Sequence, residues 1–101
     1  MIIYNVTVKI DALIAPEWLK YMQEIHIPDV INTGCFLSYR ISRLIEEDTE
    51  DDSLTYIIQY NCASIEIFKK YENNFAVKLR KEVVEKYAGH FVAFRTLMEE
   101  I

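Results

Sequence analysis

A chain of 101 residues is long enough for one domain around one modest hydrophobic core, and too short for two such domains. Hydrophobic residues make up 51% of it and charged residues 27%, a balance that excludes an intrinsically disordered protein. The net charge of −5 comes from the acidic segment 46–52, because the rest of the chain has 10 acidic against 11 basic residues. No run of basic residues stands out as a track for phosphates, so nucleic-acid binding is not expected.

No basic region precedes the apolar alternation at the N-terminus, so no signal peptide is expected. No apolar run approaches the roughly 20 residues that a membrane-spanning helix needs. Two cysteines are too few for a disulfide scaffold, and we expect both thiols to be reduced. Together these features predict a cytoplasmic protein.

The first third of the chain predicts a strand followed by a broken helix. Residues 2–10 alternate between apolar and mixed positions and are rich in β-branched side chains, as in a strand with one buried face. Pro16 fits the first turn of a helix, and apolar residues then recur at the spacing of one helical face. Pro28 disfavours helical geometry in the residue before it, so we expect a break near His26 and a second short turn that ends at Gly34.

The middle of the chain predicts a hairpin. Residues 36–45 and 54–61 form two further strands, and the acidic segment 46–52 joins them. This connection has no turn glycine, so we expect a long loop. If the hairpin is centred on this loop, Cys35 and Cys62 come close to one another.

The last third predicts a helix and a final strand. Ser64 is a good N-cap for a helix with an apolar stripe, which Asn73-Asn74 interrupts and Gly89 closes. Residues 90–98 then form the fourth strand.

The resulting order, βαββαβ, is typical of an α+β, ferredoxin-like fold with a four-stranded antiparallel sheet. Right-handed crossovers place both helical stretches on one face of this sheet, with the first and third strands in its centre. We therefore expect a single ferredoxin-like domain over residues 1–101.

The face of the sheet away from the helices is polar but contains large apolar side chains. We assign to it Asn5, Thr7, Ser38, Arg40, Ser42, Ile57, Gln59, Phe94 and Thr96. A monomer would leave Ile57 and Phe94 in water, so we expect two sheets to pack face to face in a homodimer.

Four segments resemble an uncharacterised bacterial family of small proteins that is described only as a domain of unknown function. They are MIIYNVTVKI, EWLKYMQEIHIPDVINTGCFLSYRISRLI, TYIIQYNC and GHFVAFRTLMEEI, which together span nearly the whole chain. The resemblance implies a dimeric α/β barrel, an architecture shared by antibiotic-biosynthesis monooxygenase-like enzymes, small isomerases, decyclising enzymes and non-catalytic ligand-binding modules. The family brings no assigned reaction, so it implies no catalytic residues.

A small group of side chains is the candidate site. His26 is the candidate general base, although a histidine that caps a helix end is favoured. Trp18, Tyr39 and Tyr60 can line a small-molecule pocket between sheet and helices together with His26, but an ordinary aromatic core is the favoured interpretation.

The other polar residues favour structural roles. Arg40 falls on the open sheet face, where an ion pair or backbone hydrogen bond is favoured over anion binding, and Arg95 is given the same role. The acidic segment lacks the acid spacing and the glycine of a calcium loop, and the cysteines lack zinc-site spacing. Cys35 has no visible base that would make it a nucleophile. No metal or other cofactor is expected.

The leading functional hypothesis is a small cytoplasmic homodimer with a binding or structural role and no catalysis. The first alternative is a cofactor-independent enzyme of the monooxygenase or isomerase kind, which acts on a small organic molecule. The second is an adaptor that docks another protein through the acidic loop 46–52.

Overall fold

The computed structural model of the chain describes residues 1–45 and 51–101. Over these residues, four strands and two helical runs follow one another in the predicted order. The strands are β1 (Ile2–Asp11), β2 (Ser38–Arg43), β3 (Ser53–Cys62) and β4 (Phe91–Glu99). The first helical run consists of α1 (Ala15–Tyr21), the π-helical turn η1 (Met22–His26) and α2 (Ile27–Asn32). The second consists of α3 (Ile65–Tyr71), the π-helical turn η2 (Glu72–Ala76) and α4 (Val77–Tyr87).

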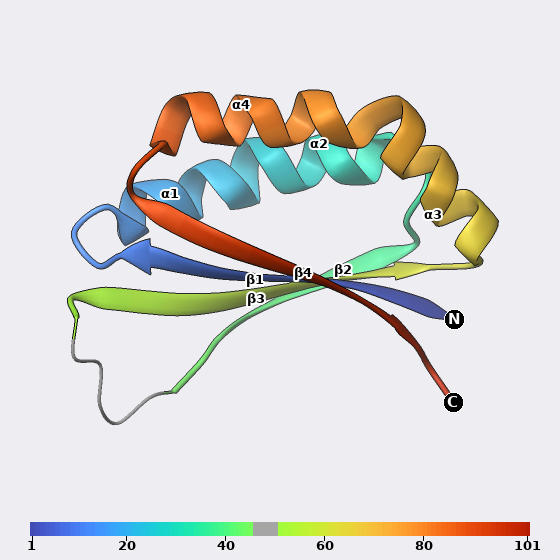
Figure 1. Cartoon of the computed structure of the whole chain (residues 1–101), viewed down its shortest axis with the longest axis horizontal. Coiled ribbons are helices and arrows are strands. Elements are labelled where there is room, and N and C mark those ends of the chain that lie inside the picture. Colours follow the sequence, from blue (N-terminus) through green and yellow to red (C-terminus); the bar gives the residue numbers. More distant parts are fainter. Residues whose placement is uncertain (46–50) are drawn as a thin grey trace.

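The strands form one antiparallel sheet in the order β2-β3-β1-β4, and both helical runs cover the same face of it (Figure 1). This is the α+β, ferredoxin-like fold, which confirms the predicted class and the central position of the first and third strands. The strand predicted over 36–45 is shorter than expected, because β2 pairs with β3 only from Ser38 to Arg43. Residues 46–50 of the predicted acidic loop lie outside the described residues.

The break predicted near His26 is wrong, because the first helical run continues to Asn32. The backbone passes through η1, after which the N–H of Ile27 donates to the carbonyl of Met22, five residues back. Pro28 has no N–H to donate, and in a regular α-helix its ring would crowd the carbonyl four residues before it. The wider turn just before the proline relieves this conflict, so the hydrogen-bond pattern changes but the helix does not end.

The second helical run likewise continues through Asn73-Asn74, where the sequence predicts an interruption and the structure has η2. The side chain of Asn74 donates to the carbonyl of Lys70 at 2.9 Å, which ties this turn to α3. The predicted caps are confirmed at both ends of the run. The hydroxyl of Ser64 accepts the N–H of Ile67 at 3.3 Å, and Gly89 follows α4 with a φ of +83°.

The hydrophobic core lies between the sheet and the helical layer. Its most deeply buried large side chains come from both layers and from the end of β3: Ile10, Trp18, Ile27, Val30, Ile58 and Cys62. Cys35 is buried as well, and the thiol of Cys62 lies 3.3 Å from the carbonyl oxygen of Cys35. The expected proximity of the two cysteines is therefore confirmed, and both are free thiols.

In the described part of the chain, no helix covers the opposite face of the sheet (Figure 1). The strand register places Thr7 between Ile57 and Phe94, as the alternation predicts. Phe94 is 67% exposed and its neighbour on the same face, Val92, is 53% exposed. None of the helices among the described residues is long and apolar enough to cross a membrane.

Candidate functional site

Two small hollows between the helical layer and the sheet share five lining residues. These are Val6 of β1, Met22 and His26 of η1, Arg80 of α4 and Arg95 of β4, and we call the space around them the central cleft. One hollow of about 30 Å³ extends toward Tyr4, Tyr60 and Tyr71, and the other, of about 40 Å³, extends toward Trp18 and Phe91. Each has room for a few water molecules or a small polar group, whereas a complete drug-sized ligand needs roughly 300 Å³ or more.

His26 reaches the central cleft from η1, the π turn that lies just before Pro28. Its Nδ1 is buried and has no hydrogen-bond partner among the described residues. Burial lowers the pKa of His26 from 6.5 to about 4, Arg95 acts in the same direction, and Asp29 opposes the shift. The imidazole is therefore neutral at pH 7.

Arg80 enters the cleft from α4 and is held from two sides. Its Nη2 donates to the hydroxyl of Tyr4 at 2.8 Å and also pairs with the carboxylate of Glu72. Glu72 is the first residue of η2, just as His26 is the last residue of η1. One π turn therefore supplies a side chain that lines the cleft, and the other supplies the partner of Arg80. Such turns are frequent at functional sites, because they displace one side chain from the regular helical spacing.

Three buried polar atoms without a hydrogen-bond partner belong to residues that line the same hollow. They are Nε1 of Trp18, Nδ1 of His26 and Nε of Arg80. In the described part of the chain, the only other side-chain atom of this kind is the hydroxyl of Tyr87. Buried polar groups in native proteins nearly always have a partner, so such a concentration points to a bound water or ligand at this place.

The tyrosines on the other side of the cleft stay protonated at neutral pH. Burial raises the pKa of Tyr60 and of Tyr71, and neighbouring phenol groups add to the shift. Both rings belong to an aromatic cluster in which Phe36 lies 5.1 Å from Tyr60 and 4.8 Å from Tyr71 between ring centroids. These hydroxyls can act as hydrogen-bond donors or acceptors, but not as anions.

The structure brings three of the four predicted site residues to the cleft. His26 lines both hollows, Trp18 lines one of them and Tyr60 lines the other. Tyr39 lines neither, because it lies on the edge strand β2, with its half-exposed ring 6.5 Å from that of Tyr60. The ring of Trp18 packs against that of Tyr56, at 5.2 Å between ring centroids.

Sequence reasoning missed both arginines of the cleft. Arg95 does not share the open face with Arg40, because it pairs with Val6 and shares the helix-side face with Phe91 and Ala93. The signal was present in the alternation, since Phe94 and Thr96 were both assigned to the open face. Arg80 had only the weaker signal of its place next to the apolar stripe of α4.

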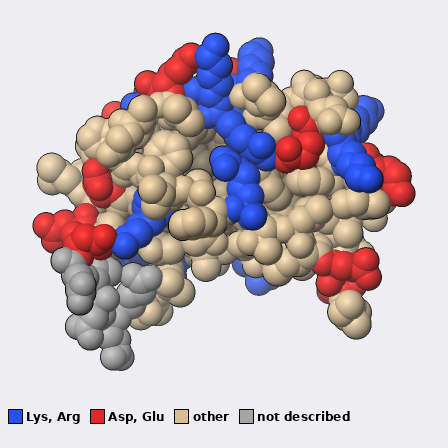
Figure 2. Space-filling model, viewed as in Figure 1, with Lys and Arg blue, Asp and Glu red and all other residues tan. Residues whose placement is uncertain are grey.

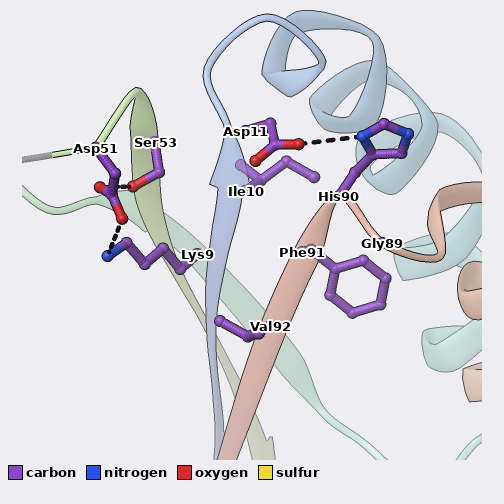
Figure 3. Close-up of a pocket in the computed structure, with 9 residues that line it drawn as sticks. All are labelled: Lys9, Ile10, Asp11, Asp51, Ser53, Gly89, His90, Phe91 and Val92. Carbon is purple, nitrogen blue, oxygen red and sulfur yellow. Dashed lines mark hydrogen bonds and ion pairs between the residues drawn. The ribbon is translucent and has the colours of Figure 1, made fainter.

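A larger and more open hollow of about 190 Å³ lies at one end of the sheet (Figure 3). Its charged side chains pair with one another, since Lys9 bonds Asp51 at 2.8 Å and His90 bonds Asp11 at 3.1 Å. These pairs are about half exposed, so they contribute little to stability. In contrast to the central cleft, this hollow has none of the described buried polar atoms that lack a partner.

Solved structures with a similar fold include three proteins of low sequence identity. An ethyl tert-butyl ether d (ethd) family protein from Bacillus halodurans is 11% identical over 100% of both chains, with a TM-score of 0.71. A dimeric ferredoxin-like protein from an uncultured marine organism is 13% identical over 100% of this chain and 95% of that one, with a TM-score of 0.72. An antibiotic biosynthesis monooxygenase is 12% identical over 100% of this chain and 99% of that one, with a TM-score of 0.70. At such identities the likeness establishes the fold alone.

No curated protein has a sequence that matches this chain. The family described as domain of unknown function (DUF4286) matches residues 1–101, which is the whole chain. This match confirms the resemblance to a domain of unknown function, and the protein belongs to the DUF4286 family.

Proposed function

We propose that the protein is a homodimeric binding module that holds a small organic molecule in the central cleft and does not transform it. The observation that carries this proposal is the set of unpartnered buried polar atoms on Trp18, His26 and Arg80, whose residues line one hollow. A cleft that only packed the core would be lined by apolar atoms or by polar atoms already bonded to one another.

The open sheet face supports the homodimer. Phe94 and Val92 lie next to each other along β4 on this face at 67% and 53% exposure, and Met98 continues the same row. Such a row is unfavourable in water and fits the self-complementary interface of a two-fold dimer. A dimeric protein with a similar fold supports the same assembly.

The absence of catalysis is proposed because the cleft lacks a matched acid and base. His26 is neutral at pH 7, but a base with a pKa near 4 abstracts protons weakly. Tyr60 and Tyr71, with raised pKa values, hold their protons too firmly to act as acids at neutral pH.

One observation favours an enzyme as the second candidate. A neutral imidazole with an unpartnered nitrogen, beside two arginines, resembles the minimal set that a cofactor-independent enzyme needs: a proton acceptor, an anchor and an apolar wall. The test is turnover of the bound compound by the purified protein and by a His26→Gln variant. Turnover that this substitution abolishes would replace the binding module with the enzyme.

Native mass spectrometry tests the main proposal. The purified protein is measured under native conditions and again after denaturation, so that a non-covalent adduct is seen in the first spectrum and lost in the second. We expect a dimer with a reproducible small-molecule adduct. A Trp18→Leu variant should lose the adduct, and a Leu13→Ala variant, changed at an exposed site, should keep it.

A monomer would contradict the proposed assembly. A dimer whose adduct survives the Trp18→Leu change would contradict the proposed site. The adaptor hypothesis depends on the acidic loop, of which residues 46–50 lie outside the described part of the chain. It stays a prediction, as does the cytoplasmic location.

A further inference from the structure

The charged side chains at the central cleft are mainly basic. Arg80 and Arg95 line both hollows, from α4 and β4. Figure 2 shows Lys and Arg side chains gathered in a band that runs from α4 to β4, the two elements that carry these arginines. Of the acids near the cleft, Glu72 is paired with Arg80, and Asp29 acts on His26 from its own helical run.

The unpartnered atoms call for a hydrogen-bond acceptor. The indole Nε1 of Trp18 and the guanidinium Nε of Arg80 carry hydrogens and only donate. Nδ1 of His26 donates or accepts according to its tautomer. A group in the hollow that bonds the N–H groups of both Trp18 and Arg80 must therefore offer two acceptor lone pairs, as the oxygens of a carboxylate do.

Arg80 already holds a carboxylate in this structure. Glu72 binds its Nη2, while the hydroxyl of Tyr4 accepts from the same nitrogen at 2.8 Å. Both partners of the Glu72–Arg80 pair are about one-third exposed, so the pair is partly screened by water and its disruption costs little. Arg95, by contrast, has no ion-pair partner among the described residues, although it lies close enough to His26 to lower the pKa of the imidazole.

We propose that the central cleft binds the anionic oxygen group of a small organic acid at the unpartnered Nε of Arg80, and that Glu72, paired with Nη2 of the same guanidinium, weakens this binding through its negative charge. This inference rests on the proposed binding function and adds the chemical class of the ligand. The hollows accommodate only the acidic head, so the remainder of the ligand extends through the opening of the cleft.

Two probes of equal shape test the class of ligand. Sodium acetate and acetamide are titrated separately into the full-length protein at pH 7 and constant ionic strength, and the indole N–H signal of Trp18 is followed by NMR. The chain contains 1 tryptophan, so this signal reports on the cleft without ambiguity. We expect a saturable shift with acetate and an affinity for acetamide that is at least about tenfold weaker, because a charge-assisted hydrogen bond is lost.

Substitutions test the roles of the charged residues. Glu72→Gln should tighten acetate binding by up to about fivefold, because it removes a partly screened negative charge from the guanidinium that binds the anion. Arg95→Gln should weaken it by about tenfold or more. Arg80→Gln should do the same, with its fold checked by circular dichroism since Arg80 also bonds Tyr4. Lys81→Gln and Glu85→Gln change an exposed ion pair on the same helix and should leave the affinity unchanged.

Three results of the titrations would overturn the inference. They are equal binding of acetate and acetamide, no saturable shift of the Trp18 signal with acetate, and an acetate affinity that Glu72→Gln does not raise. A neutral adduct in the native mass spectrum that shifts the Trp18 signal would overturn the anionic class yet leave the binding module standing. A protein that carries no adduct and binds neither probe would contradict both proposals.

Discussion

His26 is the side chain for which the surroundings in the fold matter most. In sequence it is one of two histidines, next to a helix-disfavouring Ile-Pro pair. In the structure it lies among aromatic and aliphatic side chains of the cleft, and burial lowers its pKa to about 4. Its charge therefore differs between folded and unfolded protein over a defined range of pH.

This difference predicts a pH-dependent stability. The unfolded chain protonates His26 near pH 6.5 and the folded protein only near pH 4. The contribution of His26 to the free energy of unfolding is therefore complete above pH 6.5 and is lost as the pH falls toward 4. The loss amounts to roughly 3 kcal/mol at most. Urea unfolding of the wild type and of His26→Gln between pH 7 and 4 measures it as the difference between the two proteins.

The other histidine supplies the control. His90 is about half exposed and bonds Asp11 at 3.1 Å. A His90→Gln variant should keep the steep decline in stability below pH 6.5, whereas His26→Gln should flatten it. If both variants follow the wild type, the burial of a neutral His26 is wrong.

At the scale of the elements, the two π turns decide how side chains of the helical layer are presented, and the two glycines decide where the helical runs end. The π turns keep each helical run continuous while η1 presents His26 and η2 presents Glu72. Gly34 and Gly89 end the runs with φ values of +78° and +83°, a backbone region that disfavours residues with a Cβ. Gly89 then leads directly into β4, which carries Arg95.

Substitution of Gly89 isolates this backbone requirement. No heavy atom outside its chain neighbours lies within 4 Å of an added Cβ, so the cost of Gly89→Ala comes from the backbone alone. We expect the free energy of unfolding to fall by about 1 kcal/mol in Gly89→Ala and by less in Gly89→Asn, because asparagine tolerates positive φ better. A loss in Gly89→Asn that equals or exceeds the loss in Gly89→Ala would contradict a cost set by the positive φ. Urea unfolding at pH 7 measures both.

At the scale of the whole molecule, the two faces of the sheet differ in what covers them. The helix side contains the core and the central cleft, whereas the open side presents a row of apolar groups to its surroundings. The open side also contains a hollow of about 380 Å³, which is lined partly by Ile3, Arg40 and Gln59. The proposed dimer covers the open side and leaves the helix side, with the central cleft, accessible.

Phe94 tests the proposed dimer. A Phe94→Asp variant places a charge in the exposed apolar row of the edge strand β4 in both protomers, which disfavours burial of that face without touching the core. Size-exclusion chromatography with light scattering should show dissociation of the dimer by at least about a hundredfold in Kd. Val77→Asp, at a 75% exposed position on α4, should remain dimeric. A dimeric Phe94→Asp protein would contradict an interface on this face.

The sequence by itself determined the order of the elements, the sheet topology, the helix caps and the composition of the open face. These features depend on residues close together in the chain: the two-residue period of β1, the hydroxyl of Ser64, and the lack of a Cβ in Gly34 and Gly89. Local conformational preference and the handedness of crossovers are sufficient to place them.

The tertiary structure alone decided the composition of the central cleft. Arg80 bonds Tyr4, 76 positions away in the chain, and Arg95 meets His26 through the pairing of β4 with β1. The helical runs also continued where Pro28 and Asn73-Asn74 predicted breaks, because packing against the sheet outweighs a local cost that a π turn reduces. Which polar atoms remain unpartnered is a property of the packed interior, so no local pattern in the sequence specifies it.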